Sequence, residues 1–402
     1  MRNSLGYHVT AETLGNVERV PLLKLLAFTL AGFITIMTET MPAGLLSQIS
    51  HDLNISESLA GQLISVYALG SVIAAIPIVA ATRSWSRRPL FLLAIGGLLV
   101  FNSLTALSSS YVVILVSRLI AGMSAGIIWG VLAGYARHMV PVHLQGRALA
   151  IAGVGQPVAL CFGVPLGTLL GNLFDWRGVF WVMSALALIL IGWASTALPN
   201  FSGQKSTKRQ SVRKIFLLPG IRSVLWVIFL WILAHNILYT FISPYLELVG
   251  LGNHVDMILL LFGISSSLGI FITGVWIDQA LRLLTMLSLT GFACAAILLI
   301  AGNTHVWIVF LGITLWGITF GGAPTLLQTA IADAAGDDAD VAQSMLVTVF
   351  NLAVASGGLI GGGLLQQIGP SSFAITMFAL IILSILVVFQ AKPYGFKPGP
   401  RV

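Results

Sequence analysis

Long apolar runs recur along the whole sequence, and they constrain the fold more than any other feature. The hydrocarbon core of a bilayer is about 30 Å thick, and a helix needs about 20 residues to cross it. Runs of this length occur twelve times in the 402 residues, with approximate limits 22–46, 59–82, 89–107, 111–139, 147–171, 176–198, 222–248, 255–279, 282–301, 305–331, 341–368 and 371–391. They are too long and too uniformly apolar for barrel strands. The sequence therefore predicts an all-α membrane protein with twelve transmembrane helices.

The positive charges predict an orientation. Only 8% of the residues are charged and 57% are hydrophobic, which lies outside the range of soluble domains. If both termini are cytoplasmic, all of the 20 Lys and Arg except Arg118 and Arg177 fall at the cytoplasmic ends of the runs. This topological bias accounts for the net charge of +7 without a nucleic-acid partner.

A polar, basic segment divides the chain. The apolar pattern stops between Pro199 and Arg222, in a stretch rich in Ser, Lys and Arg. We expect an N-terminal six-helix bundle at 1–198, a cytoplasmic linker at 199–221, and a C-terminal six-helix bundle at 222–402. Such a division is typical of transporters built from two parallel repeats.

Glu39 is the one acidic residue that lies deep within an apolar run. A charged carboxylate near the middle of a membrane helix costs at least a few kcal/mol, so it is neutral, paired, or facing a water-filled cavity. Thr35, Thr38, Glu39 and Pro42 recur at helical spacing and form one stripe, which we expect to face the interior. Because each of these situations suggests proton-coupled transport, Glu39 is the candidate proton-coupling residue.

Arg118 is the candidate partner of Glu39. The helical rise places both residues about 10 Å from the outer ends of their runs. Since a buried pair costs less than a lone buried charge, we expect Arg118 to stabilise the ionised carboxylate in one conformation and to release it on protonation. The alternative is a static pair, or an Arg118 that bonds backbone carbonyls.

The run 222–248 brings polar side chains to the middle of the second half. His235 lies near the midplane, Asn236 follows it, and Tyr239 and Thr240 lie one turn further. Their imidazole, amide, phenol and hydroxyl groups suit a hydroxylated solute, so these four residues are predicted to bind substrate. His235 could also carry a proton, because imidazole titrates near physiological pH. The alternative is a His that bonds a neighbouring helix.

Other polar or aromatic residues inside the runs are candidates for the wall of a cavity. Packing or bonding between helices is the alternative for each, and Asn351, near the middle of its run, is the strongest candidate. The set comprises Tyr67, Trp129, Gln156, Trp316, Gln328 and Asn351.

Metal, cofactor and enzyme chemistry are not expected. The acidic stretch 333–340 lacks His and Cys, and the sequence contains no phosphate-binding Gly-Lys-Ser/Thr loop. An intramembrane enzyme would need reactive groups clustered at one depth, and the runs supply only scattered ones. A sensor or channel on the same scaffold is the other rival.

Short motifs mark several runs. The loop 82–89 contains Arg87-Arg88, the run 255–279 ends in Gly274-Val275-Trp276-Ile277-Asp278 and is followed by Arg282, and the run 147–171 contains Gly163-Val164-Pro165-Leu166-Gly167. These motifs resemble those of the major facilitator superfamily, in its bacterial drug:proton antiporter branch. The resemblance implies gating roles for Arg87, Arg88, Asp278, Arg282, Gly163, Pro165 and Gly167. The family's Asp is absent from the first loop, so the lock attributed to that Asp is not implied.

Two further segments, Ala234-His235-Asn236 and Phe350-Asn351, are similar to those of arabinose-type sugar efflux members. The resemblance implies a proton-coupled, monomeric exporter of the bacterial inner membrane that works by alternating access. Its expected substrate is a sugar or sugar-like solute, and a broad-specificity drug or nucleoside exporter is the alternative. The glycines allow tight packing or helix movement, and the sequence leaves both open.

Overall fold

The computed structural model describes residues 21–74, 81–82, 84–141, 144–202, 212–302, 305–336 and 339–399. All regular structure in these ranges is helical. The helices that precede residue 199 are α1 (Leu22–Gly44), α2 (Leu46–Leu53), α3 (Glu57–Ile73), α5 (Arg87–Leu107), α6 (Tyr111–Arg137), α7 (Gln145–Gly153), α8 (Gly155–Val158), η4 (Ala159–Gly163), α9 (Val164–Phe174) and α10 (Trp176–Ala197).

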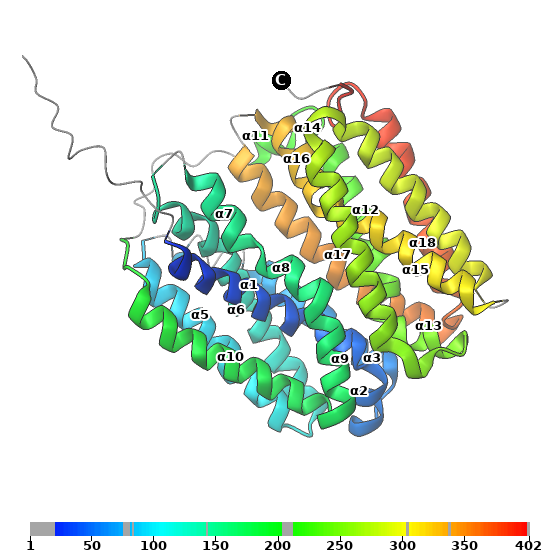
Figure 1. The fold of residues 1–402 in the computed structure, drawn as a ribbon, viewed down its shortest axis with the longest axis horizontal. Coiled ribbons are helices and arrows are strands. Elements are labelled where there is room, and N and C mark those ends of the chain that lie inside the picture. Colours follow the sequence, from blue (N-terminus) through cyan, green and yellow to red (C-terminus); the bar gives the residue numbers. More distant parts are fainter. Residues whose placement is uncertain are drawn as a thin grey trace, which may run out of the picture.

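The later helices form a second series. They are α11 (Val212–Phe216), α12 (Ile221–Thr240), α13 (Ile242–Leu248), η5 (Gly252–His254), α14 (Val255–Ala301), α15 (Val306–Gly321), α16 (Ala323–Ala335), α17 (Ala339–Gln367) and α18 (Ser372–Gln390). Figure 1 shows the first series, blue to green, beside the second, green to red.

Ten helical segments of the described chain are long and apolar enough to cross a membrane. The prediction of a multi-pass helical membrane protein is therefore confirmed, whereas the number twelve stays a prediction. Two features account for the difference. α14 is one helix of 47 residues with a kink at Ala280 (φ −148°, ψ 40°), where two runs were predicted. α3 has 17 described residues, and the rest of its run includes 75–80, which lie outside the described ranges.

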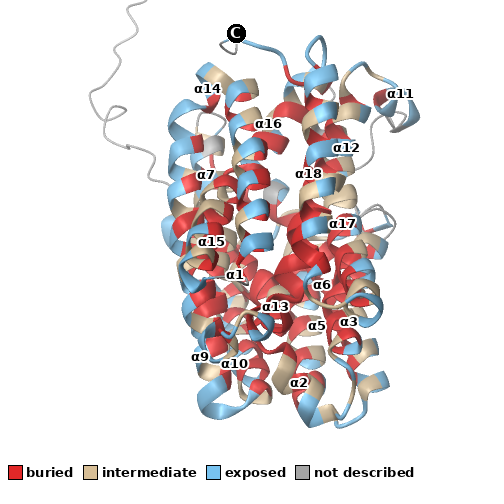
Figure 2. Ribbon diagram, turned by 90° about the vertical axis from the view of Figure 1, so that its right-hand side faces the viewer, coloured by how far each residue is buried: buried red, intermediate tan, exposed pale blue. Residues whose placement is uncertain are grey.

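The flanks and the interior differ in the way that a bilayer requires. Buried residues run through the middle of the molecule, and exposed residues cover its outside (Figure 2). Many of the exposed side chains on the long helices are large and apolar, among them Leu188, Phe271, Leu283, Leu359 and Phe389. An apolar exterior of this extent suits lipid rather than water.

Small residues let helices approach closely. In the pair formed by α3 and α6, Gly122 lies against the backbone of Tyr67, and Gly70 lies against the backbone of Leu119. A Cβ on Gly122 would lie only 2.7 Å from the carbonyl carbon of Tyr67. Such reciprocal contacts are the usual way in which membrane helices gain packing energy.

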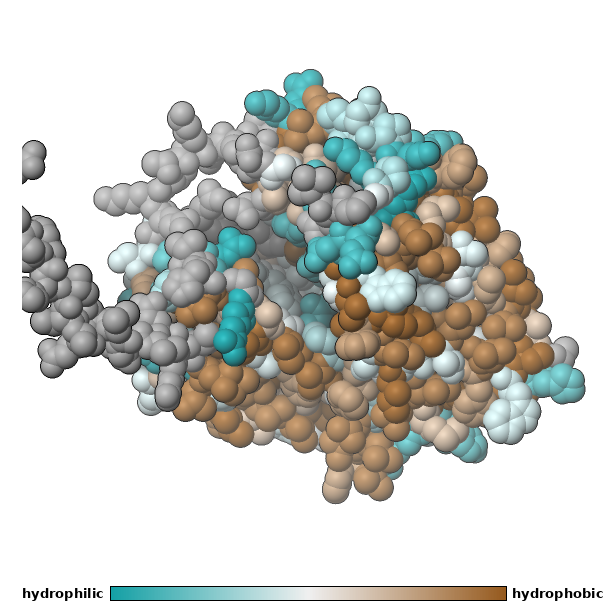
Figure 3. Space-filling model, turned by 45° about the horizontal axis from the view of Figure 1, so that its top comes forward, coloured by the Kyte–Doolittle hydropathy of each residue, from teal (hydrophilic) through white to brown (hydrophobic). Residues whose placement is uncertain are grey.

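The two series of helices meet at the end that carries α2, α9 and α13, here called the α13 end (Figure 1). There the Ser243 hydroxyl donates to the carbonyl oxygen of Ala43 at 3.3 Å. Gly263 of α14 packs against the backbone of Cys161, and Gly358 of α17 packs against Ser65. The opposite end carries α7 and α11 and is here called the linker end. Figure 3, turned to bring the top of the molecule forward, shows a hollow between the two series at the linker end.

Candidate functional site

A cavity of about 190 Å³ lies between the two series of helices. The first series contributes side chains from α1, α6 and α8, and the second contributes side chains from α16 and α17. Its wall combines one carboxyl group and three amides with aliphatic and aromatic surface. The lining residues are Ile36, Glu39, Trp129, Gln156, Pro324, Gln328, Leu346, Val347, Phe350 and Asn351.

Glu39 is nine-tenths buried, with 9% of its surface exposed, and it lines this cavity. Within the described part of the chain, no group donates a hydrogen bond to its carboxyl oxygens. Thr35 and Thr38, on the same stripe of α1, are fully buried against neighbouring helices. α1 therefore presents a single carboxyl group, without a protein hydrogen bond, to the space between the two series.

Arg118 reaches α1 at the depth of Glu39 but bonds the backbone. Its guanidinium donates to the carbonyl oxygens of Thr38 (2.6 Å), Glu39 (3.3 Å) and Leu63 (3.1 Å). It also lies over the Tyr67 ring, 4.6 Å from the centroid. In this conformation the guanidinium connects α6 to α1 and α3 through backbone carbonyls, which is one of the alternatives that the sequence left open.

Tyr67 lies behind the stripe of α1. It is fully buried, and its hydroxyl donates to the carbonyl oxygen of Thr35 at 2.9 Å. It does not line the cavity described above. Its place against α1 and under Arg118 makes it a support for the helix that carries Glu39.

Three amide side chains and two aromatic rings complete the cavity. Asn351 donates from Nδ2 to the carbonyl oxygen of Val347 at 2.9 Å, which leaves its own carbonyl oxygen free to accept. Gln156 and Gln328 make no side-chain hydrogen bond within the described chain. Trp129 and Phe350 are half-buried in the wall. The aromatic side chains can therefore stack on a planar ring of a solute, and the amides can form hydrogen bonds with its polar edges.

His235 belongs to a separate aromatic cluster. Its ring stacks on Phe320 with centroids 3.6 Å apart and planes inclined by 6°, and it stacks on Tyr239 at 5.0 Å. Trp316 and Phe262 close the cluster at 5.2 and 5.7 Å from His235. The Nδ1 of His235 and the Nε1 of Trp316 are buried without hydrogen-bond partners in the described structure.

Asn236 and Thr240 of α12 do not line this cavity. Asn236 donates from Nδ2 to the carbonyl oxygen of Ile232 at 2.9 Å and packs against Gly357. The Thr240 hydroxyl is fully buried and has no partner in the described structure. The structure thus brings Glu39, Trp129, Gln156 and Asn351 to one cavity, and it does not bring Asn236 or Thr240 there.

The residues expected to act in gating lie at helix ends and at a helix irregularity. The backbone N–H groups of Arg87 and Arg88 donate to the Phe201 carbonyl (2.9 Å) and to Asn200 Oδ1 (3.3 Å). Arg282 donates to the carbonyls of Val388 (2.8 Å) and Phe396 (3.0 Å). These contacts join α5 to the segment after α10, and α14 to the end of α18. Asp278 lies two residues before the kink of α14 and has interactions of its own.

Gly163, Pro165 and Gly167 lie where the π-helical turn η4 passes into α9. Gly163 lies against Met37, and Gly167 lies against Met41. The motif therefore packs directly on α1, the helix that carries Glu39. Single π-helical turns inside α-helices frequently lie at functional sites.

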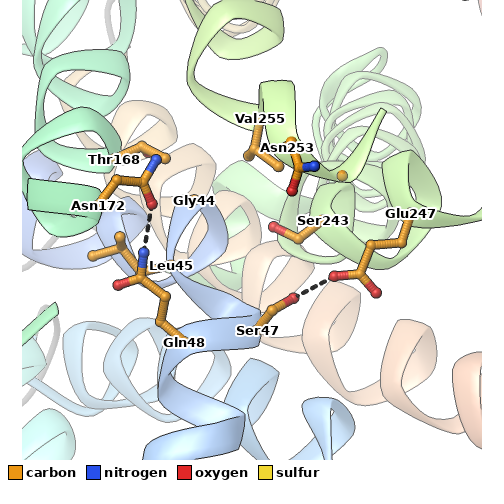
Figure 4. Close-up of a pocket in the computed structure, with 11 residues that line it drawn as sticks. Gly44, Leu45, Ser47, Gln48, Thr168, Asn172, Ser243, Glu247, Asn253 and Val255 are labelled. Carbon is orange, nitrogen blue, oxygen red and sulfur yellow. Dashed lines mark hydrogen bonds between the residues drawn. The ribbon is translucent and has the colours of Figure 1, made fainter. Parts of the chain in front are cut away.

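A second pocket, of about 230 Å³, lies at the α13 end. Figure 4 shows Ser47 of α2 directed toward Glu247, and Gln48 of α2 donating a hydrogen bond to Asn172 Oδ1 at 2.6 Å. The sequence patterns did not single out these residues. They lie near the ends of runs, where polar side chains are ordinary, so the only available signal is a polar residue at a predicted boundary.

A helical membrane protein with a polar cavity between two groups of helices, closed toward one end, has the architecture of a transporter. The sequence profile described as Major Facilitator Superfamily matches residues 28–339 and 255–401. This chain belongs to the Major Facilitator Superfamily.

Relatives that are named as efflux pumps match most of the chain. The purine ribonucleoside efflux pump NepI of Escherichia coli O6:H1 is 30% identical over 356 residues, which is 88% of this chain and 90% of the relative. The proteins of that name from Escherichia coli K12 and Shigella flexneri are 29% identical over 357 residues, with the same coverage. The protein is therefore a multi-pass membrane transporter of a small molecule and not an enzyme.

Proposed function

We propose that this protein exports a purine nucleoside, or a solute much like one, in exchange for protons. The observation that carries the proposal is the Glu39 carboxyl group, which faces the cavity between the two series without a protein hydrogen bond. A buried ionisable group in a transporter marks the path of an ion or substrate. Alternating access would expose this cavity first to one side of the membrane and then to the other.

The nucleoside alternative has more support than the sugar that the resemblance first implied. The names of these relatives describe purine ribonucleoside efflux. Trp129 and Phe350 offer faces for a planar base, and Gln156 and Asn351 offer hydrogen bonds for its edges.

The proposal includes twelve spans in two six-helix halves, at 1–198 and 222–402, joined by a cytoplasmic linker. Counting α14 as two spans at its kink, and α3 as one, supports the number twelve. Both termini would be cytoplasmic in a bacterial inner membrane, as the distribution of Lys and Arg favours. The cavity would then open to the cytoplasm in this conformation, with the α13 end closed toward the outside.

Proton coupling is assigned to Glu39, with Arg118 as the group that positions α1 around it. Arg118 acts electrostatically on the carboxyl group although it does not bond it in this conformation. His235 is a weaker candidate for a proton carrier, because its neighbours in the cluster are aromatic rings rather than charged groups. We assign His235, Tyr239 and Trp316 to the support of the cavity wall in the second half.

Transport by purified protein in proteoliposomes tests the proposal. Labelled adenosine should accumulate against its gradient when a pH gradient is imposed, and Glu39→Gln should lower that accumulation by about tenfold or more. Exchange of labelled for unlabelled adenosine without a pH gradient should persist in Glu39→Gln, because exchange needs no net proton movement. Asp256→Asn, which removes a carboxyl group at the first turn of α14, is the matched control and should behave as wild type. Full retention of pH-driven accumulation by Glu39→Gln would refute proton coupling at this residue.

A further inference from the structure

The carboxyl group of Glu39 is an acceptor without a donor. It is nine-tenths buried, it lines the cavity, and no described side chain or backbone N–H bonds it. An ionised carboxylate is an acceptor only, with two oxygens that can each receive a hydrogen bond. A buried acceptor left without a donor costs free energy, so a solute that brings donors to this place gains what the protein lacks.

The rest of the cavity limits where those donors can lie on the solute. The aromatic faces of Trp129 and Phe350 suit a planar base, and the amides of Gln156 and Gln328 offer donors and acceptors for its edges. Asn351 donates one N–H of its side-chain amide to the backbone carbonyl oxygen of Val347, so its own side-chain oxygen can accept a hydrogen bond from the solute. Glu39 differs from all of these because it is the one carboxyl group among the described residues of the wall, and its two oxygens suit a group with two adjacent donors.

We propose that the Glu39 carboxylate accepts hydrogen bonds from the two vicinal hydroxyls of a ribose ring, so that the substrate diol and the proton compete for the same two oxygens. This inference rests on the proposed function and specifies how that function recognises its substrate. A vicinal diol presents two O–H donors close enough to meet the two oxygens of one carboxylate. Protonation turns one oxygen into a donor, which removes one of the two acceptors.

Competition between the diol and the proton for the Glu39 carboxylate explains why substrate is exchanged for a proton. With the diol bound, a proton cannot occupy Glu39 without the loss of a charge-assisted hydrogen bond, which is stronger than a neutral one. With the proton bound, the carboxyl group is neutral and the diol is held less tightly. Each ligand therefore favours the departure of the other from one site.

We expect the proton to bind the Glu39 carboxyl group and not one of the groups around it. Arg118 of α6 acts on it electrostatically, Tyr67 of α3 lies against the Arg118 guanidinium, and both side chains donate to backbone carbonyls of α1 or α3. α8 brings the neutral Gln156, and across the cavity α16 and α17 bring amides and apolar side chains. His235 of α12 is enclosed in its aromatic cluster, and Cys161 of η4 bonds Ser267.

Binding of adenosine and 2′,3′-dideoxyadenosine to the purified full-length protein, measured at pH 5.5 and pH 8, tests the inference. Adenosine should bind at least about tenfold more tightly at pH 8 than at pH 5.5, where tenfold corresponds to about 1.4 kcal/mol. The dideoxy analogue keeps the base but lacks the diol, so it should bind about tenfold more weakly than adenosine at pH 8 and show little dependence on pH. Glu39→Gln should bind both compounds alike at both pH values.

The outcomes separate this inference from the proposed function. If dideoxyadenosine binds as tightly as adenosine at pH 8, or shares its pH dependence, the diol contact is refuted while nucleoside transport stands. If neither nucleoside binds at either pH, the nucleoside function is refuted and the inference with it. The comparison of analogues uses the wild-type protein, so it holds even if Glu39→Gln fails to fold.

Discussion

At the scale of single residues, Arg118 is a charged side chain that is fully buried in the first series. A fully buried guanidinium is expensive unless its N–H groups are bonded, and here three backbone carbonyls from two helices accept from it. The planar fork of an arginine can span such separated acceptors, whereas the point charge of a lysine cannot. Arg118 is thus a structural clamp at the level of Glu39.

Arg118→Lys should therefore destabilise the protein. One or more of the carbonyls of Thr38, Glu39 and Leu63 would lose its donor, and the cost should be about 2 kcal/mol. Thermal or denaturant unfolding of the purified protein measures this effect. Arg222→Lys, at an exposed position of α12, is the control and should change stability by less than about 0.5 kcal/mol. Equal effects of the two substitutions would argue against the clamp.

Sequence alone distinguishes some of these residues and not others. Glu39, Arg118 and Asn351 stand out because each is polar within an apolar run, and membrane interiors penalise such residues. Phe320 and Phe262 gave no signal, because an aromatic residue among apolar neighbours is ordinary. That His235 stacks on them was decided by the packing of α12 against α14 and α15.

At the scale of helices, close approach depends on small residues at defined places. The reciprocal contacts of Gly70 and Gly122 bring α3 against α6, and this pair carries Tyr67 and Arg118 to the back of α1. The position of Glu39 therefore depends on glycines in helices other than its own.

Gly122→Ala and Gly134→Ala form a matched pair on α6. A Cβ at Gly122 would overlap the backbone of Tyr67, whereas a Cβ at Gly134 would meet no described atom within 4 Å. We expect Gly122→Ala to destabilise the protein by about 1–3 kcal/mol through overpacking. Gly134→Ala should be neutral or slightly stabilising, because alanine favours the helix. Thermal unfolding compares them, and a neutral Gly122→Ala would contradict the packing shown here.

The existence of the helices was readable from the sequence, and their irregularities were not. Apolar length predicts a span, because a bilayer leaves the backbone few other ways to satisfy its hydrogen bonds. The break between α12 and α13 at Phe241 and the π-helical turn η4 lie inside uniformly apolar runs. Hydropathy does not report such local changes of hydrogen bonding, since they alter the backbone and not the composition.

At the scale of the whole molecule, one serine joins segments that lie far apart in the sequence. The Ser47 hydroxyl contacts Glu57 Oε1 at 2.8 Å and Glu247 Oε1 at 2.9 Å, at the α13 end (Figure 4 shows the contact with Glu247). A hydroxyl has one hydrogen and donates to one carboxylate, so the second short contact favours a proton on Glu57, whose pKa is raised above its ordinary value by burial and by the nearby Glu247. Closure of the α13 end should therefore be favoured by acid.

Labelling of an introduced cysteine measures this closure. In a variant whose Cys161 and Cys294 are replaced by serine, Asn253→Cys places a thiol in the pocket at the α13 end. A membrane-impermeant thiol reagent should label it several-fold more slowly at pH 5.5 than at pH 8, because two ionised carboxylates repel each other across the contact. Adding Glu57→Gln should keep labelling slow at both pH values, since the neutral amide needs no proton. Labelling that is independent of pH before that substitution would refute a proton in this contact.

The sequence by itself determined the class of the protein: helices that cross a membrane, a transporter architecture, and a deep carboxyl group at Glu39. These follow from the cost of exposing backbone polar groups and charges to hydrocarbon, and that cost can be judged from the residues of each run alone. Only the tertiary structure decided that Glu39 shares a cavity with Trp129, Gln156 and Asn351, and that Arg118 bonds carbonyls instead of the carboxylate. Those outcomes depend on which helix faces meet, and helix faces meet through packing between distant segments, which no local pattern records.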